Sequence, residues 1–158
     1  MRYGADLEKA LIAGLLHDCA KCVPSAEKIK LCERNHIEIS EAEYQNPGLL
    51  HAKLGAFFAR KKYGIEDEEI LMAIRSHTTG RPGMSLLEKI VYIADYMEPG
   101  RKDLPNMMDV RHLAFEDIDK CLYRILRDSL VYLKAQDMPI DQTTEETYQY
   151  YNELYSKH

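Results

Sequence analysis

Apolar residues recur every three or four positions along almost the whole chain, which is the period of an amphipathic α-helix. The clearest stretches are 7–15, 54–58, 70–74, 87–94 and 122–133. No segment keeps the strict alternation of apolar and polar residues that marks a half-buried strand. The pattern predicts an all-α fold, with helices near residues 5–18, 25–34, 40–45, 49–63, 67–77, 85–97, 109–114, 117–136 and 143–156.

Local start and stop signals divide this pattern into separate helices. Three Ser/Thr-x-x-Glu pairs have the spacing of a capping box, in which each side chain bonds a backbone amide of the other residue. Turns rich in glycine and proline interrupt the pattern between helices. The predicted caps are the pairs Ser40–Glu43, Ser85–Glu88 and Thr143–Glu146, together with Asp67 as an N-cap.

Composition and charge narrow the class of protein. A chain of 158 residues that is 46% hydrophobic and 30% charged can build one core, so we expect residues 1–158 to form a single domain. A net charge of −5 argues against a dedicated nucleic-acid or anionic-membrane binder. No apolar run approaches the roughly 20 residues of a membrane span. Without an export signal, the 4 cysteines are expected to be reduced thiols in the cytoplasm.

Residues with ligand chemistry stand out against the apolar pattern. His17 and Asp18 end one apolar run, and Asp95 interrupts another that otherwise suits a core. A buried carboxylate must pair, become protonated or bind a cation. His51 lies near the start of one predicted helix and His77 at the end of the next. A single such histidine is more often a packed or capping residue, whereas the set of five favours a metal site.

This order, His-Asp, His, His and Asp on four successive predicted helices, resembles the HD-domain metal-dependent phosphohydrolases. Within that superfamily, three segments together with His51 look like the YqeK-type family: GLLHDCAK at 14–21, HTTGRPGMS at 77–85 and KIVYIADYMEPGR at 89–101. The resemblance covers almost the whole chain and is strongest over 10–101. It implies a symmetrical diadenosine tetraphosphate hydrolase with a di-iron centre.

The resemblance also implies a role for each candidate ligand. Asp18 would bridge the two metals. One metal would be held by His51 and His77, and the other by His17 and Asp95.

The family pattern begins with a further histidine on a preceding helix, and residues 1–16 contain none. The chain therefore reads as shortened at its N-terminus, and we expect one metal to be held by one protein ligand fewer. Water, His112 or His158 could take the vacant position.

Substrate contacts are carried over from the same resemblance. Lys21, three residues after Asp18, is expected to act with it in catalysis and to meet phosphate. For the basic residues the alternative is a solvated surface charge. The predicted substrate-binding residues are Lys21, Thr79, Arg81, Arg101, Ile140, Asp141 and Thr144.

The reaction implied is attack of a metal-activated water on an inner phosphorus, giving two ADP. Three alternatives stay open: an HD phosphohydrolase for another nucleotide such as a phosphorylated guanosine alarmone, a nucleotide-binding module with an incomplete metal site, and an all-α domain with structural histidines. A homodimer is also left open. Tyr148, Tyr151 and Tyr155 form one helical stripe, which indicates core packing or a subunit contact.

Overall fold

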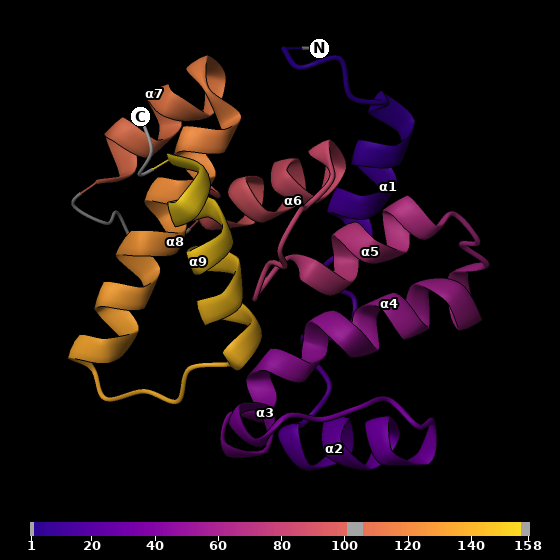
Figure 1. Ribbon diagram of the computed structural model, residues 1–158. Coiled ribbons are helices and arrows are strands. Elements are labelled where there is room, and N and C mark those ends of the chain that lie inside the picture. Colours follow the sequence, from indigo (N-terminus) through magenta and orange to yellow (C-terminus); the bar gives the residue numbers. More distant parts are fainter. Residues whose placement is uncertain (1, 101–105, 156–158) are drawn as a thin grey trace.

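The structure is a computed structural model that describes residues 2–100 and 106–155 (Figure 1). Within these residues the regular elements are all helical, which confirms the all-α prediction, and every predicted helix is present with bounds shifted by two residues or fewer. None of the described helices is long and apolar enough to cross a membrane. The elements are α1 (Leu7–Leu16), α2 (Ser25–Arg34), α3 (Glu41–Gln45), the 3₁₀ turn η1 (Pro47–Leu49), α4 (Leu50–Tyr63), α5 (Glu68–Ser76), α6 (Leu86–Tyr96), α7 (Met107–Glu116), α8 (Ile118–Ala135) and α9 (Gln142–Tyr155).

Most of the predicted caps are present. The Ser40 and Ser85 capping boxes are both formed, and Asp67 accepts hydrogen bonds from two backbone amides at the start of α5. The Thr143–Glu146 box is wrong, because α9 begins before Thr143. There the carboxylate of Asp141 accepts the Thr143 amide at 2.9 Å and takes the place of the predicted cap.

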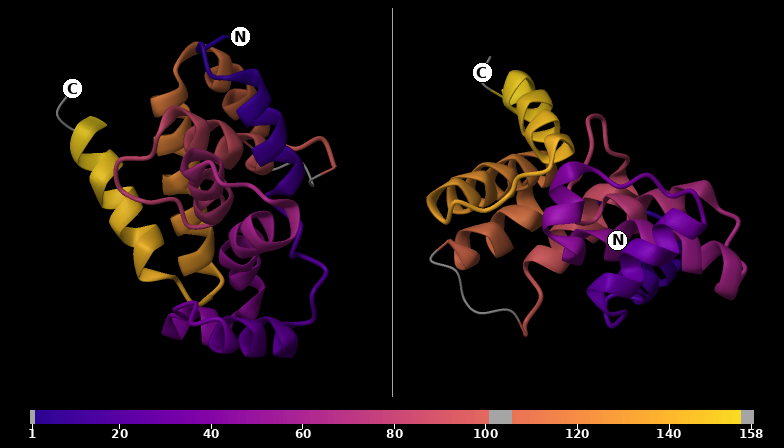
Figure 2. Two further views of the ribbon diagram at one scale, coloured as in Figure 1. Left: turned by 90° about the vertical axis from the view of Figure 1, so that its right-hand side faces the viewer. Right: turned by 90° about the horizontal axis from the view of Figure 1, so that it is seen from below.

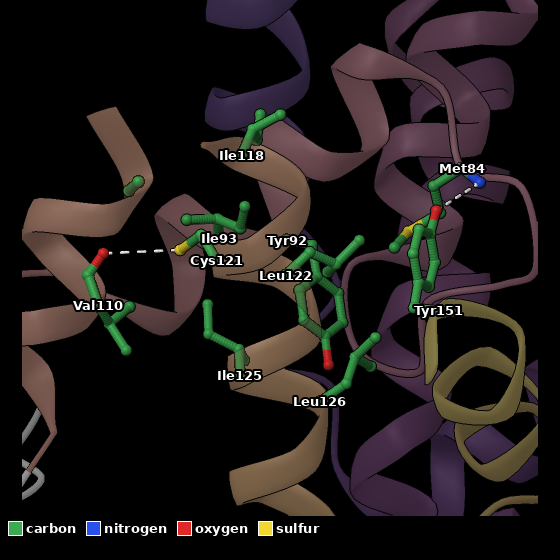
Figure 3. Close-up of a cluster of buried hydrophobic side chains, with 11 residues drawn as sticks. Met84, Tyr92, Ile93, Val110, Ile118, Cys121, Leu122, Ile125, Leu126 and Tyr151 are labelled. Atoms are coloured by element: carbon green, nitrogen blue, oxygen red, sulfur yellow. Dashed lines mark hydrogen bonds between the residues drawn. The ribbon is translucent and has the colours of Figure 1, made fainter. Parts of the chain in front are cut away.

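Helix α6 lies between two hydrophobic clusters, and its opposite faces belong to different ones. Leu87 and Val91 pack with α1, α4 and α5. Tyr92 and Ile93 pack with α7, α8 and α9, as Figure 3 shows. Helices α2 and α3 lie on the side of α4 opposite α5, and α7 to α9 stand beside the first six helices (Figures 1 and 2). This packing brings together the termini of the helices around α6.

The tyrosine stripe of α9 packs inside the protein. Tyr151 is 2% exposed, and its hydroxyl oxygen accepts the Met84 amide at 3.0 Å. Tyr148 and Tyr155 both stack on Tyr123 of α8. The expectation of core packing is confirmed. The 4 cysteines are free thiols, as predicted.

Candidate metal centre

The five predicted ligands lie at helix termini that come together at one place in the fold. His17 and Asp18 follow the last turn of α1, and His51 lies in the first turn of α4. His77 caps the C-terminus of α5, and Asp95 lies in the last turn of α6. Because α1, α4, α5 and α6 share one hydrophobic cluster, their ends converge.

Asp18 is at the centre of the group, and its two oxygens face different histidines. Oδ1 lies 3.2 Å from His51 Nε2 and 3.6 Å from His77 Nε2. Oδ2 lies 3.5 Å from His17 Nε2, and the same nitrogen is 3.5 Å from Asp95 Oδ1. The carboxylate therefore divides the group into two sets of side chains, one at each oxygen.

The backbone orients all three imidazoles in the same way. Each Nδ1 lies within hydrogen-bond distance of the carbonyl oxygen three residues earlier, and a carbonyl can only accept. Nδ1 must therefore carry the proton, which leaves an acceptor lone pair on the inward Nε2, the form in which histidine binds metals. The three bonds are His17 to Gly14 at 2.7 Å, His51 to Gly48 at 2.6 Å and His77 to Ile74 at 2.7 Å.

These atoms fit a bound cation. Among the described residues, buried Asp18 Oδ1 finds no hydrogen-bond donor. The Nε2 atoms of His51 and His77 lie 2.9 Å apart, with both Nδ1 protons already directed at carbonyls. A lone pair therefore faces a lone pair beside a negative oxygen, an arrangement that a proton or a metal ion must relieve. His17, Asp18 and His77 each offer a ligand atom within 4.8 Å of the others, so they form a possible metal site.

The electrostatics favour the ligand forms of Asp18 and His51, whereas the contact with Asp95 raises the pKa of His17. Burial by itself would raise the pKa of Asp18, but contacts with His77 and Lys21 hold it well below its usual range. Lys21 Nζ lies 2.5 Å from Asp18 Oδ2. Burial lowers the pKa of His51. Asp18 is thus ionised and His51 neutral near pH 7, which are the states that metal binding requires.

The predicted substrate residues Arg81 and Thr79 are already engaged within the protein. Arg81 donates from Nε and Nη2 to the two carboxylate oxygens of Glu88, both at 2.7 Å. Thr79 Oγ1 donates to the Gly80 carbonyl at 3.0 Å. The structure places both residues in the turn that follows His77, and their contact with phosphate stays a prediction.

The remaining candidates that the structure describes lie at the start of α9 or on the surface of α7. Ile140, Asp141 and Thr144 surround the first turn of α9, and Asp141 and Thr144 are buried. His112 is exposed on α7 and lies 3.1 Å from Glu116. Arg101 and His158 lie outside the described residues.

Sequence reasoning missed two features of this region. One is Glu88, which is 1% exposed and holds the Arg81 guanidinium; its only sequence signal was its place in a capping box. The other is the bond from Ser40 to Asp141 at 2.6 Å, which joins residues 101 positions apart and has no local signal.

The chain is similar to several known proteins over most of its length. The HD domain family model matches residues 1–100. A Bacillus subtilis (strain 168) protein named bis(5'-nucleosyl)-tetraphosphatase, symmetrical, is 42% identical over 147 residues, which are 93% of this chain and 78% of that protein. A protein of the same name from Halalkalibacterium halodurans is 42% identical over 92% of this chain and 77% of its own length. A Clostridium acetobutylicum crystal structure, described as a predicted HD superfamily hydrolase involved in NAD metabolism, superposes with a TM-score of 0.92 at 41% identity, covering 97% of this chain and 80% of that one.

Proposed function

The chain belongs to the HD domain family, alongside the symmetrical bis(5'-nucleosyl)-tetraphosphatases, and from that premise we propose that it hydrolyses diadenosine tetraphosphate to two molecules of ADP. One observation carries the proposal: His17, Asp18, His51, His77 and Asp95 converge from four helices in the order that the resemblance requires. We also propose that residues 1–158 form a single HD-type domain.

We infer that the donor set takes two divalent cations, with iron as the metal in the cell. The division of Asp18 supports this inference. Its Oδ1 would be shared with His51 and His77 at one cation, and its Oδ2 with His17 and Asp95 at the other. When bound, divalent cations of this kind lower the pKa of water and neutralise charge on phosphoryl oxygens.

The chain's own residues supply orientation and charge. The three Nδ1–carbonyl bonds fix the imidazole planes before any ligand arrives, so little reorganisation is needed on binding. The Lys21 ammonium is held at Asp18 while its side chain stays 54% exposed, so it can also donate to a phosphate oxygen. The leaving group is itself a diphosphate, so compensation of its charge matters more than a strong general acid.

The free thiols of the cysteines support the cytoplasm as the setting of this activity. A nucleotide substrate is small, which agrees with the absence of any strongly basic character in a chain of net charge −5.

The test is the identity of the products. The chain is incubated with diadenosine tetraphosphate and ferrous iron without oxygen, and the nucleotides are separated by anion-exchange chromatography. ADP as the sole product is expected. A mixture of ATP and AMP would contradict symmetrical cleavage. Nucleotide binding without any turnover would instead favour a binding module with an incomplete metal site.

A further inference from the structure

The start of α9 is fixed to a distant segment by a buried carboxylate. Asp141 is 6% exposed. One oxygen, Oδ2, accepts the Ser40 hydroxyl at 2.6 Å, and Oδ1 accepts the Thr143 amide at 2.9 Å. Both carboxylate oxygens are therefore occupied by donors of the protein itself.

Ser40 in turn bonds to an ion pair whose carboxylate is buried and whose ammonium is partly exposed. Glu43 is 2% exposed, and its Oε2 accepts the Ser40 amide at 2.7 Å and Lys53 Nζ at 2.7 Å. Lys53 also donates to the Glu38 carbonyl at 2.9 Å. Lys53 belongs to α4 and lies two residues after His51. We call Ser40, Glu43, Lys53 and Asp141 the polar clasp, because they join α9 to the helix that carries a candidate ligand.

The same face of α9 also meets the turn that follows His77. A Cβ placed on Gly80 would lie 2.8 Å from Thr147 Cγ2, which shows how closely the turn approaches the helix. Further along α9, Tyr151 accepts the Met84 amide. Figures 1 and 2 show the start of α9 beside α3 in both views. Helix α9 is thus held against the segment before His51 and against the turn after His77.

Buried ionic groups are an inefficient source of stability, because the desolvation of two charges offsets most of their attraction. Apolar residues of the same volume would stabilise the contact at least as well. What a fully bonded polar group does provide is one defined position, since any shift leaves a buried donor or acceptor unpaired. The polar clasp has this character, and it joins the start of α9 to α4, the helix that carries the candidate ligand His51.

We propose that the polar clasp is a positioning device, which holds the start of α9 as a wall of the nucleotide site, and that Asp141 acts through the placement of α9 without touching the substrate. The proposal rests on the proposed function for its substrate, a dinucleoside tetraphosphate. Loosening the clasp weakens substrate binding and leaves the metal ligands in place.

The decisive variant is Ser40→Asp. Asp is as good an N-cap as Ser, so α3 keeps its first turn. The new carboxylate faces that of Asp141, and like charges at this distance repel. We expect KM for diadenosine tetraphosphate to rise roughly 10-fold or more, a loss the size of one charge-assisted hydrogen bond. We expect kcat to stay within about twofold and metal content to be unchanged, because no ligand is altered.

A second substitution supplies the rescue. In Ser40→Asp/Asp141→Asn, the new amide can donate to the carboxylate at position 40 while its oxygen still accepts the Thr143 amide. KM is expected to return to within about threefold of the wild-type value, a difference of about 0.6 kcal/mol. The matched control is Asp117→Asn, which makes the same change at the N-cap of α8, where the carboxylate accepts backbone amides of its own helix. It should leave KM and kcat unchanged.

Each outcome decides the proposal. An unchanged KM in Ser40→Asp, or a loss of kcat and metal that the second substitution does not rescue, overturns it. Should Ser40→Asp fail to fold, Asp141→Ser keeps an N-cap for α9 but is too short to reach Ser40, and the same rise in KM is expected. Amide hydrogen exchange over residues 138–147 needs no substrate and should accelerate in both variants. A wild-type protein without activity would refute the proposed function. Amide exchange that stays the same in the variants would refute the positioning role of the polar clasp, whether or not the wild type is active.

Discussion

Replacing Glu88 by Gln is predicted to destabilise the turn that follows His77. The Glu88 side chain is almost fully buried. Its carboxylate accepts hydrogen bonds from two Arg81 nitrogens and from the Ser85 amide, each at 2.7 Å. The variant Glu88→Gln keeps the shape of the side chain. It removes the negative charge and places an amide NH2 group against a guanidinium that can only donate.

The magnitude follows from the burial of the two partners. Removing one charge of a buried ion pair costs about 3–5 kcal/mol. The Arg81 side chain is 36% exposed, so water restores part of its solvation and the loss is reduced to about 2 kcal/mol. For a chain of this length, about 2 kcal/mol corresponds to a fall in Tm of about 4–8 °C.

The pH dependence has a definite sign. Burial by itself would raise the pKa of Glu88, but the bonds from Arg81 and the Ser85 amide bring it below its ordinary value. A carboxylate whose pKa is lower in the folded state contributes stability above its unfolded pKa and loses it as pH falls. The gap between wild type and Glu88→Gln should therefore be full near pH 7 and close as the pH falls below about 4.

Urea unfolding of both proteins at several pH values measures this gap. The matched control is Glu68→Gln, whose exposed side chain pairs with Arg60 on the surface and should change the free energy of unfolding by less than about 0.5 kcal/mol. The reasoning is refuted if Glu88→Gln matches wild type at pH 7, or if the gap widens as the pH is lowered.

Three further predictions concern the same region. Gly80→Ala should lower Tm in a thermal melt by more than Glu68→Gln does, because φ is +65° and the new Cβ would meet Thr147; an unchanged Tm would contradict this contact. Tyr151→Phe leaves the buried Met84 amide without its acceptor and should cost about 1–2 kcal/mol in urea unfolding, whereas a neutral effect would show that the bond is dispensable. Dialysis against a chelator should lower Tm, and ferrous or manganous ions should restore it. At a free metal concentration 100 times Kd, the bound metal should add roughly 2.7 kcal/mol to the free energy of unfolding. A Tm that changes with neither chelator nor metal would contradict a metal site.

The sequence predicted the helices well because each is defined locally. The apolar period and the two serine capping boxes depend on residues within one or two turns of each other. The start of α9 was misplaced for the opposite reason. Asp141 and Thr143 are both good N-cap residues, and the choice between them is made by Ser40, far away in the chain.

Of the candidate site, too, the sequence predicted one part and not another. The identity of its five candidate ligands followed from polar residues in apolar surroundings and from their order. The arrangement did not: which oxygen of Asp18 faces which histidine depends on the relative positions of four helices. The pairing of Arg81 with buried Glu88 was equally out of reach, since an arginine next to a glycine turn ordinarily reads as solvated.

The most direct test of the central claim is the rate of ADP formation from diadenosine tetraphosphate by Asp18→Asn beside the wild type, with ferrous iron supplied to both. Asn keeps the size of the side chain and can still face the histidines, but it lacks the charge that both ligand sets share. Substituting the central carboxylate is predicted to lower kcat by at least roughly 100-fold while the circular dichroism spectrum stays helical. Turnover by Asp18→Asn at the wild-type rate would contradict a metal-dependent reaction centred on this residue.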